Sequence, residues 1–552
     1  MTSYLLVIIM KIRMNSVTYT LVIALFFTLF QNIALWERVN SIFATTPEAS
    51  WGLKLTLPIV VLAIMNVLFT LLTWPLIHRL IVSVIILISA AATYAMHQYG
   101  IVLSYGMIVS VIETDTHEAT SYLSMSAFIW YFALAILPLL LLSRVKVEFR
   151  HLGKELLLKF ASLMVSVLVV ACIASVYFKD YASLLRNNSE LGSALNPTNY
   201  ITATARVVNK RWYEANLPYV QIGTDAVNRN QDNPRKNLVV LVIGETARAE
   251  NSSFNGYEKE TNAFLAKQEG VINYPNVTSC GTCTAVSVPC MFSNMTKSSY
   301  NASKARRQDS VVDILDHAGV DVLWKNNNSG CKGACDRITY IDGHEQVKVQ
   351  EKYCQWGTCF DGILLEGLDE HINSLDTDGV IVLHLLGSHG PTYYKRYPEE
   401  FKKFTPTCDT ADIQNCSREE LMNTYDNSLL YTDYLLSQLI DKLKSHDDKF
   451  NTAMLYVSDH GESLGEKGVY LHGMPASIAP KHQTHVPMIT WMSDKFVTKH
   501  QLDEQCMQKV SNEKLSHDNF FHSVLGLMDI ETSEYNAELD IFATCLTQGE
   551  NQ

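Results

Sequence analysis

The sequence predicts a helical membrane part followed by an α/β domain with a mostly parallel sheet. The chain has 552 residues, of which 18% are charged, and its mean hydropathy of +0.05 is high for a soluble protein with that many charges. Long apolar runs fill residues 1–178, whereas polar and charged residues return at globular frequency afterwards. We therefore expect a transmembrane domain over 1–178, a linker with short helices over 179–236 and a soluble domain over 237–552.

Five apolar runs are long enough to cross a bilayer, which takes roughly 20 helical residues for about 30 Å of hydrocarbon. They are Val17–Trp36, Leu55–Trp74, Leu80–Met96, Leu123–Leu142 and Phe160–Phe178. Shorter connections separate these runs from one another. The sequence therefore predicts a multi-pass membrane protein with five spans.

The charges of the connections predict how the spans are oriented, because Lys and Arg are retained on the cytoplasmic side. The connection between the fourth and fifth spans holds Arg144, Lys146, Arg150, Lys154 and Lys159. Residues 97–122, between the third and fourth spans, hold no Lys or Arg but do hold Glu113, Asp115 and Glu118. We therefore expect a cytoplasmic N-terminus, and everything after residue 178 outside the cytoplasm.

The cysteines support that topology independently, since all but Cys172 of the twelve lie in the soluble part. Eight of them form the close pairs Cys280/Cys290, Cys331/Cys335, Cys354/Cys359 and Cys408/Cys416. Such pairs in polar, loop-like sequence are typical of disulfides in an oxidising compartment such as the periplasm. The alternative is a thiolate zinc site, but no pair has the doubled C-x-x-C spacing. Cys283, Cys506 and Cys545 are left over, and Cys506 with Cys545 is a further candidate pair.

Short apolar runs rich in β-branched residues predict the strands of the soluble domain, since such runs suit strands buried on both faces. They are Leu238–Gly244, Val320–Trp324, Val380–Leu386, Ala453–Ser458 and Val486–Trp491. Helical stretches such as Ser310–Ala318 and Leu421–Leu443 lie between them. Strands that alternate with helices imply a mostly parallel sheet covered on both faces.

The residues that follow these strands indicate a metal site, because ligands bind beyond the carboxyl ends of parallel strands. The first, third and fourth runs are followed by Glu245, by His389, and by Asp459 with His460. Carboxylates and neutral imidazoles are ligands suited to Zn²⁺. Each of these residues alone is more simply a capping or loop residue. Three strand ends that present acids and histidines together favour a metal site.

A metal site with a nucleophile performs group transfer, and the segment Thr278–Cys290 offers hydroxyl groups beside Gly281. If a helix begins here, its free N–H groups and dipole favour a phosphate anion and stabilise an alkoxide. The alternative is a disulfide-closed loop whose threonines are N-caps. Spacing alone does not choose between Thr282 and Thr284.

Five longer motifs carry a family resemblance. They are NLVVLVIGETAR from Asn237, TSCGTCTA from Thr278, GSHGPTY from Gly387, YDNSLLYTD from Tyr425 and SDHGESLGE from Ser458. The chain resembles the lipid A phosphoethanolamine transferases, including the mobile colistin-resistance enzymes, over nearly its whole length. This resemblance implies five membrane helices in a bacterial inner membrane, ahead of a periplasmic catalytic domain of the alkaline phosphatase and sulfatase type.

The resemblance also implies a role for each matching residue. Zinc would be held by Glu245, Asp459, His460 and the nucleophile Thr284. His389 and His472 match additional histidines that are linked to substrate or to a second zinc. Phosphoethanolamine contacts match Ser329, Lys332, Thr114 and Glu118. The chain departs from the family at Ser110, a contact position where relatives often carry Asn, and at Cys283, where they often carry Ser.

These matches imply transfer of phosphoethanolamine from phosphatidylethanolamine to a phosphate of lipid A through a phosphoethanolamine-threonine at Thr284. His389 or His472 would act as an acid or base, or would bind a second metal. The added ammonium group makes lipid A less negative, so cationic peptides such as polymyxin and colistin should bind less well.

Three alternative functions would each require different residues or a different acceptor. A transferase of the same architecture could differ only in its acceptor, which would be a lipopolysaccharide core sugar or a periplasmic glucan. A sulfatase would need a Cys/Ser-x-Pro-x-Arg segment, and CTAVS from Cys283 lacks both Pro and Arg. A non-catalytic binding protein predicts a missing ligand or nucleophile, whereas all four are present. The net charge of −12 gives no basic field for nucleic acid. The resemblance implies lipid partners, and we expect a monomer.

Overall fold

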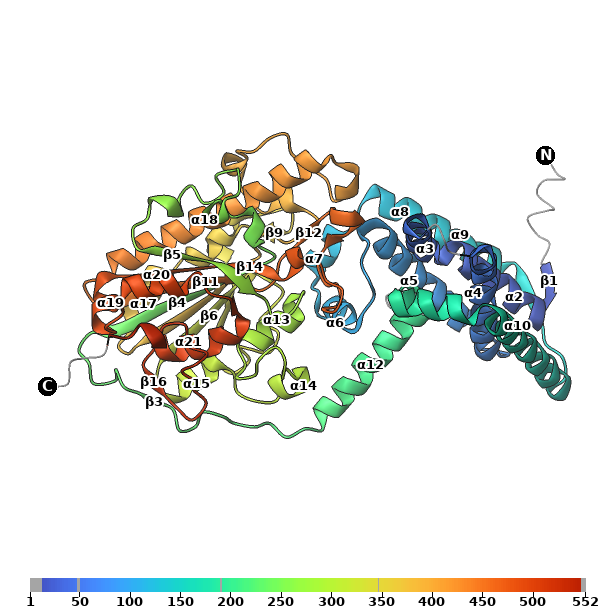
Figure 1. Ribbon diagram of the computed structural model, residues 1–552, viewed down its shortest axis with the longest axis horizontal. Coiled ribbons are helices and arrows are strands. Elements are labelled where there is room, and N and C mark those ends of the chain that lie inside the picture. The colour runs from blue at the N-terminus through green and yellow to red at the C-terminus, as the bar shows by residue number, and fades with distance from the viewer. Residues whose placement is uncertain (1–11, 47–49, 189–190, 346, 548–552) are drawn as a thin grey trace. The chain divides into compact units, whose positions relative to one another are not determined.

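The computed structural model describes residues 12–46, 50–188, 191–345 and 347–547 (Figure 1). Its contacts divide the chain into two compact units. The first, here called the helical unit, comprises Met1–Ser104 and Leu123–Ala205, and the second, the α/β unit, comprises Tyr105–Tyr122 and Arg206–Gln552. The boundaries expected from composition at residues 178 and 236 remain predictions.

The helical unit consists of helices and one small pair of parallel strands. Its helices are α2 (Ser16–Phe26), α3 (Ile33–Thr45), α4 (Trp51–Leu72), α5 (His78–Tyr99), α8 (Met125–Tyr131), α9 (Leu137–Ser143), α10 (Leu152–Asn187) and α11 (Leu191–Ala194), with π-helical turns over Phe27–Gln31 and Phe132–Ile136. The strands are β1 (Ile12–Asn15) and β2 (Val145–Glu148). Helix α12 (Thr198–Ala215) continues the chain into the α/β unit, within the segment expected to be a linker.

Four helical segments of the described chain are long and apolar enough to cross a membrane, namely α4, α5, Met125–Ser143 and α10. A fifth span exists if Ser16–Gln31 and Ile33–Thr45, which are bent by 57°, count as one. The sequence predicts a single run over Val17–Trp36, whereas the structure breaks it. The break follows a π-helical turn, and the Asn32 side chain there donates to Phe27 O at 3.0 Å.

An eight-stranded sheet organises the α/β unit (Figure 1). Its strands lie in the order β15 (Leu515–Ser516), β5 (Val271–Thr278), β14 (His485–Met492), β11 (Phe450–Ser458), β4 (Lys236–Gly244), β10 (Gly379–His384), β6 (Asp321–Asn326) and β7 (Thr339–Asp342). The five strands from β11 to β7 run parallel, whereas β14 is antiparallel to both of its neighbours. The expected mostly parallel sheet is confirmed, and all five predicted strands belong to it.

Alternate side chains of β4 enter two separate cores, one on each face of the sheet. Val239, Leu241 and Ile243 belong to the first core, and Leu238, Val240 and Val242 to the second. Helices α15 (Val311–His317) and α21 (Phe520–Leu527) contribute to the first, and α17 (Leu368–Ser374) and α18 (Arg418–Ser445) to the second. Because both faces are buried, the strand is apolar from Leu238 to Gly244, and polar side chains flank that run.

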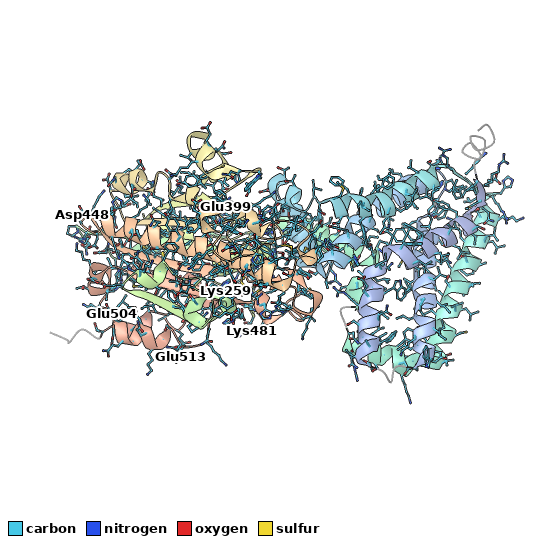
Figure 2. All side chains as sticks on the ribbon, turned by 90° about the horizontal axis from the view of Figure 1, so that it is seen from above. Lys259, Glu399, Asp448, Lys481, Glu504 and Glu513 are labelled. Carbon is cyan, nitrogen blue, oxygen red and sulfur yellow. A yellow bond between two sulfur atoms is a disulfide. The ribbon has the colours of Figure 1, made fainter. Side chains whose placement is uncertain are left out.

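Shorter elements and disulfides complete the α/β unit. The shorter elements are α6 (Tyr105–Glu113), α7 (Thr116–Ser121), α13 (Thr284–Met291), α14 (Ala302–Ala305), α16 (Val347–Tyr353), α19 (Asp494–Lys499), α20 (Glu504–Val510), β3 (Val227–Asn228), β8 (Cys354–Gln355), β9 (Thr358–Cys359), β12 (Ser463–Leu464), β13 (Tyr470–Leu471) and β16 (Ile530–Glu531). The bonded cysteines are Cys280–Cys290, Cys331–Cys335, Cys354–Cys359, Cys408–Cys416 and Cys506–Cys545. Charged side chains such as Asp448, Glu504 and Glu513 project from its surface (Figure 2).

Candidate active site

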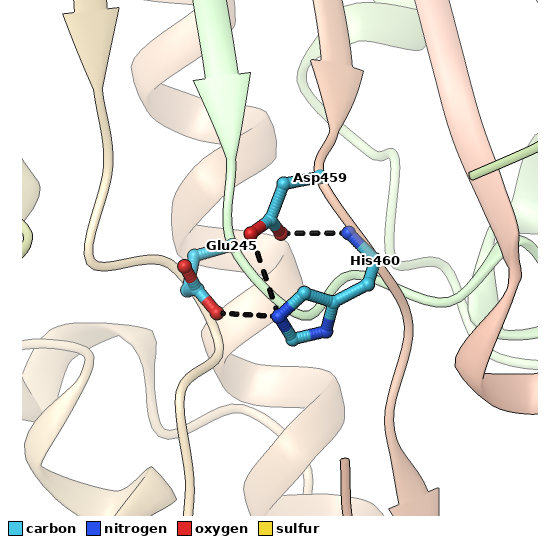
Figure 3. Close-up of side chains that lie close together, drawn as sticks. All are labelled: Glu245, Asp459 and His460. Carbon is cyan, nitrogen blue, oxygen red and sulfur yellow. Dashed lines mark hydrogen bonds and ion pairs between the residues drawn. The ribbon is translucent and has the colours of Figure 1, made fainter. Parts of the chain in front are cut away.

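The carboxyl ends of the adjacent strands β4 and β11 bring three ligand-type side chains together (Figure 3). The register pairs Ser458 with Gly244, so Asp459 and Glu245 are the next residues on neighbouring strands. His460 Nε2 lies 3.3 Å from Glu245 Oε1 and 3.4 Å from Asp459 Oδ2. One ligand atom from each of the three residues lies within 4.8 Å of the others. The sheet edge thus holds the acids and the histidine that the strand-end pattern indicated.

The charges of this cluster are strongly coupled because all three side chains are fully buried. Burial, and then the charge of Glu245, raise the pKa of Asp459 to about 8. Burial alone would lower the pKa of His460, but the two carboxylates outweigh it and raise that pKa to about 10. Burial would likewise raise the pKa of Glu245, but His460 holds it well below its ordinary value. Near pH 7, Asp459 therefore keeps its proton beside the Glu245 carboxylate and the His460 imidazolium, and a bound cation would take the place of that proton.

Two buried oxygens of the cluster, Glu245 Oε1 and Asp459 Oδ2, have no well-aligned hydrogen bond among the described residues, and both face the same nitrogen, His460 Nε2. Buried polar atoms without a hydrogen-bond partner are uncommon in folded proteins, and a bound cation satisfies such oxygens. Two carboxylate oxygens and an imidazole nitrogen are also ligand types that Zn²⁺ accepts. Glu245, Asp459 and His460 therefore fit a divalent metal ion.

Thr284 opens helix α13, and its hydroxyl faces the cluster. Thr284 Oγ1 donates to Glu245 Oε2 at 3.0 Å and lies 3.3 Å from His460 Nε2. The hydroxyl of Thr282 instead donates to the carbonyl of Met474 at 2.7 Å. The sequence leaves both threonines open, and of the two the structure brings Thr284 to the acids and the histidine. The start of a helix also favours negative charge on the Thr284 oxygen.

Two contacts hold the loop that precedes Thr284. The first is the disulfide between Cys280 and Cys290, which connects the loop to α13. The second is His517, whose Nδ1 accepts from Cys280 N at 3.2 Å while its Nε2 donates to Ser458 O at 2.9 Å. Burial lowers the pKa of His517 to about 3, so its ring is neutral and can make both bonds. His517 is not predicted from the sequence, because no local pattern marks it.

His472 and His389 extend the cluster along the same edge of the sheet. The ring of His472 lies 4.4 Å from that of His460 and 5.1 Å from that of His389. His389 Nε2 is 3.4 Å from Glu118 Oε1, and His472 Nδ1 is 3.4 Å from Glu462 Oε2. Burial lowers the pKa of His389 to about 4 and that of His472 to about 3. Both rings are therefore neutral near pH 7, and a neutral imidazole can accept a proton or bind a metal.

The turn that follows β6 carries the next predicted residues. Lys332 Nζ donates to the carbonyl oxygen of Ser329 at 2.6 Å and to its hydroxyl at 2.8 Å. Asn328, which was not predicted from the sequence, donates to Glu245 Oε2 at 2.7 Å. Asn328 lies just after β6, as Glu245 lies just after β4. It could therefore have been found from the rule that ligands bind beyond the carboxyl ends of parallel strands. Asn328 connects this turn directly to the buried cluster.

Residues 105–122, expected as a connection between two spans, form α6 and α7 and group with the α/β unit. Glu113 Oε1 accepts from Arg306 Nη2 at 2.7 Å and from Arg211 Nη2 at 3.0 Å. Both arginines belong to the α/β unit, so these ion pairs attach the segment to it.

Three predicted substrate contacts lie on this segment. Glu118 faces His389 across the 3.4 Å contact between their side chains. The hydroxyl of Thr114 donates to the carbonyl of Ser110 at 2.7 Å, within its own helical turn. Ser110 interacts with the thiol of Cys283, whose pKa burial raises to about 11. Cys283 therefore stays protonated and is a poor nucleophile.

Comparison with known families covers both parts of the chain. A family model described as phosphoethanolamine transferase EptA/EptB matches residues 61–212, and one described as sulfatase matches residues 237–530. Phosphoethanolamine transferase EptA of Escherichia coli (strain K12) is 44% identical over 96% of this chain and 97% of its own length. Phosphatidylethanolamine transferase Mcr-1 of Escherichia coli is 35% identical over 92% of this chain and 94% of its own length.

Two solved structures from Neisseria meningitidis are similar to this chain. The integral membrane protein lipooligosaccharide phosphoethanolamine transferase A (EptA) aligns with a TM-score of 0.94 and 39% identity, over 97% of this chain and 100% of its own. The soluble domain of the same transferase aligns with a TM-score of 0.58 and 46% identity, over 60% of this chain and 100% of its own.

Proposed function

This chain belongs to the phosphoethanolamine transferase family, and on that premise we propose that it moves phosphoethanolamine from phosphatidylethanolamine to a phosphate of lipid A. Its N-terminal helices span the membrane, and its catalytic domain is soluble and periplasmic. Donor and acceptor are both lipids, so an enzyme anchored in the bilayer meets both. The observation that carries the proposal is the Thr284 hydroxyl, which lies 3.0 Å from Glu245 Oε2 at the start of a helix.

Zinc is the proposed metal, and Glu245, Asp459, His460 and Thr284 are the residues that would hold it. When bound, Zn²⁺ lowers the pKa of a coordinated hydroxyl and polarises a phosphate oxygen. Two buried carboxylate oxygens, Glu245 Oε1 and Asp459 Oδ2, lack a well-aligned hydrogen bond within the described part of the chain, which supports this assignment. The protein supplies the buried, preorganised position for that chemistry.

In the first half of the reaction, Thr284 Oγ1 attacks the phosphorus of phosphatidylethanolamine. A bond forms between the threonine oxygen and phosphorus, and the bond from phosphorus to the diacylglycerol oxygen breaks. Glu245 Oε2 accepts the hydroxyl hydrogen at 3.0 Å and so orients the Thr284 oxygen, while a neutral histidine, His389 or His472, can take the proton. That same proton passes to the diacylglycerol oxygen as it leaves. Phosphoethanolamine then remains attached to Thr284.

In the second half, a phosphate oxygen of lipid A attacks the same phosphorus. The new bond joins the two phosphates, and the bond to Thr284 breaks. The proton that the acceptor phosphate carried passes to the threonine oxygen, which restores the hydroxyl. His389 and His472 are neutral near pH 7, so each can accept a proton in either half or bind a second metal ion.

The remaining predicted residues would bind the group that is transferred. Lys332 would hold phosphate oxygens as a point charge, with its ammonium positioned by Ser329. Glu118 would attract the ethanolamine ammonium, and Thr114 and Ser110 lie on the same segment. Since the product carries an added ammonium group, lipid A becomes less negative and polymyxin or colistin should bind it less well.

Mass spectrometry of lipid A from cells that express the chain tests the proposal. The wild type should add phosphoethanolamine, Thr284→Ala should add none, and Thr284→Ser, which keeps a hydroxyl, should retain part of the activity. Thr282→Ala is the matched control, because its hydroxyl is bonded to Met474 O rather than to the cluster. Addition by Thr284→Ala at the wild-type level would refute the role of this residue. Modification of another acceptor, with lipid A left unchanged, would refute the acceptor.

A further inference from the structure

A cavity in the α/β unit lies next to the proposed transfer site and contains a buried arginine. Its lining includes Arg396, Lys395, Asn328, Trp356 and Glu118. We call it the arginine cavity. Asn328 belongs both to this lining and to the cluster, since it donates to Glu245 Oε2 at 2.7 Å. The cavity therefore adjoins the residues that would activate Thr284.

The guanidinium of Arg396 makes three hydrogen bonds, and all three acceptors are neutral. Nε donates to the carbonyl of His389 at 2.7 Å, Nη1 to the hydroxyl of Thr358 at 3.1 Å, and Nη2 to the hydroxyl of Thr392 at 3.2 Å. A guanidinium has five N–H donors. Two N–H donors of Arg396 therefore remain for a ligand. Arg396 lines the cavity, and only 6% of this residue is exposed.

Arg396 has no carboxylate within ion-pair distance among the described residues. Asp361, Glu118 and Glu245 contribute favourable charges from beyond ion-pair distance, and the oxygens of Asp361 already accept from Leu386 N at 2.7 Å and Gly387 N at 2.8 Å. The other buried arginine of this unit, Arg248, pairs with Glu466 at 2.9 Å. A buried cation without a paired anion is costly, and an anionic ligand in the cavity would remove that cost.

The reaction itself needs a second site for an anion. Transfer brings two phosphate groups together, and they repel each other unless each has its own cation. The phosphate at Thr284 would have the metal site and Lys332, whereas the acceptor phosphate needs a different partner. Arg396 is suited to that task, because the planar guanidinium can donate two parallel hydrogen bonds to phosphate oxygens. It also lies close to the cluster, since it donates to the carbonyl of His389 and lines the same cavity as Asn328.

We propose that Arg396, with Lys395 beside it, binds the phosphate of the acceptor lipid in the arginine cavity. This inference rests on the proposed function and deepens it. Trp356, which is 64% exposed on the rim, provides an apolar surface for the rest of the acceptor. Glu118, on another part of the lining, stays available for the ammonium group that is transferred.

The test uses the purified full-length protein in micelles, with fluorescent phosphatidylethanolamine as donor and lipid A as acceptor. Diacylglycerol release without lipid A reports the first half of the reaction, and transfer at varied lipid A concentration reports the second. Arg396→Gln should raise the KM for lipid A about tenfold or more, because it removes a charged hydrogen-bond donor. Its rate of diacylglycerol release should stay within about twofold of the wild type.

Matched variants separate an anion site from a structural role. Arg396→Lys keeps the charge but loses the two guanidinium hydrogen bonds to Thr358 and Thr392. Its affinity for lipid A should therefore lie between those of Arg396→Gln and the wild type. Lys395→Gln, at a half-buried position, should raise the same KM about threefold. Lys402→Gln is the control, since this lysine pairs with Asp409 at 2.9 Å outside the cavity.

Three outcomes would overturn the proposal. The first is an unchanged KM for lipid A in both Arg396→Gln and Lys395→Gln. The second is a rise in the KM for phosphatidylethanolamine instead, which would assign the phosphate to the donor. The third is a fall of diacylglycerol release together with transfer that Arg396→Lys does not recover, which would make Arg396 a structural support of His389. If the wild type itself moves nothing to lipid A, the proposed function fails as well, and the wild-type assay alone reveals it.

Discussion

Asn328 donates a 2.7 Å hydrogen bond to Glu245 Oε2, the same oxygen that accepts the hydroxyl of Thr284. The amide also donates to the carbonyl of Leu385 at 2.9 Å, so its orientation is defined from two sides. The other oxygen of this carboxylate, Glu245 Oε1, faces His460 Nε2 at 3.3 Å. A side chain that orients a proposed metal ligand in this way should affect both metal binding and transfer.

Asn328→Ala should therefore lower zinc affinity or transfer activity by about 10- to 100-fold, the usual effect of losing a residue that orients a ligand. Zinc affinity can be measured by competition with a chromophoric chelator, and transfer by mass spectrometry of lipid A. Asn512→Ala, at an exposed position, should change neither. Wild-type values of both quantities in Asn328→Ala would show that the hydrogen bond to Glu245 has no role in the site.

The disulfide Cys280–Cys290 should matter more for activity than for stability. The loop that it closes contains Thr284, so its loss removes a constraint on the position of the nucleophile and increases the conformational entropy of the unfolded chain. The double variant Cys280→Ser with Cys290→Ser should lose most transfer activity and about 2–4 kcal/mol of unfolding free energy. Thermal unfolding and lipid A modification measure the two effects.

The matched control is Cys408→Ser with Cys416→Ser, which opens a loop of similar length ahead of α18. It should lose comparable stability and keep the turnover rate of the wild type. Equal losses of activity in the two double variants would mean that the loop before Thr284 needs no special support.

Removal of the metal should destabilise the protein, since Glu245 and Asp459 then remain buried with one histidine between them. Adding Zn²⁺ at about 100 times its Kd should raise the free energy of unfolding by about 3 kcal/mol. Thermal unfolding of chelator-treated protein with increasing Zn²⁺ measures this effect without any activity assay. Asp459→Asn should abolish the response. A wild-type melting temperature that does not change with added Zn²⁺ would argue against the metal site.

Asp433 should make stability depend on pH. It lies on α18 and accepts from Phe264 N at 2.7 Å, and burial raises its pKa from 3.8 to about 7. Between those values the folded protein keeps a proton that the unfolded chain has released, so the free energy of unfolding falls as pH rises from about 4 to about 7. Asp433→Asn removes this titration, so its free energy of unfolding should fall less than that of the wild type between about pH 5 and about pH 7.5.

Thermal unfolding across that pH range measures how the free energy of unfolding changes with pH. Asp441→Asn, an exposed position on the same helix, should behave as the wild type does. If Asp433→Asn has the same slope as well, the carboxyl of Asp433 is not the titrating group.

Part of the site was predictable because it depends on local patterns. Glu245, Asp459 and His460 directly follow strands, and neighbouring parallel strands in register must end at one edge of the sheet. Asn328 meets the same criterion after β6 but was not predicted. The choice between Thr282 and Thr284 was not predictable from spacing, since it depends on the residue at which α13 begins and on what each hydroxyl meets.

Other features depend on residues that are far apart in the sequence. The bend at Asn32 involves a hydrogen bond to the carbonyl of Asn196, 164 residues away. His517 reaches back to Cys280 over 237 residues, and no periodicity or motif near it signals that contact. No sequence pattern marks Arg396 either, because its burial without a paired carboxylate is a property of the folded cavity.

The sequence by itself determined the two-part architecture, the mostly parallel sheet and the edge at which the acids and histidines meet. Hydrophobic runs and strand ends are local, and burial on both faces of a sheet dictates their pattern. Only the tertiary structure decided which threonine faces the acids, which side chains orient them, and that α6 and α7 join the α/β unit. Those choices depend on hydrogen bonds and ion pairs between distant segments, whose partners are defined only once the chain has folded.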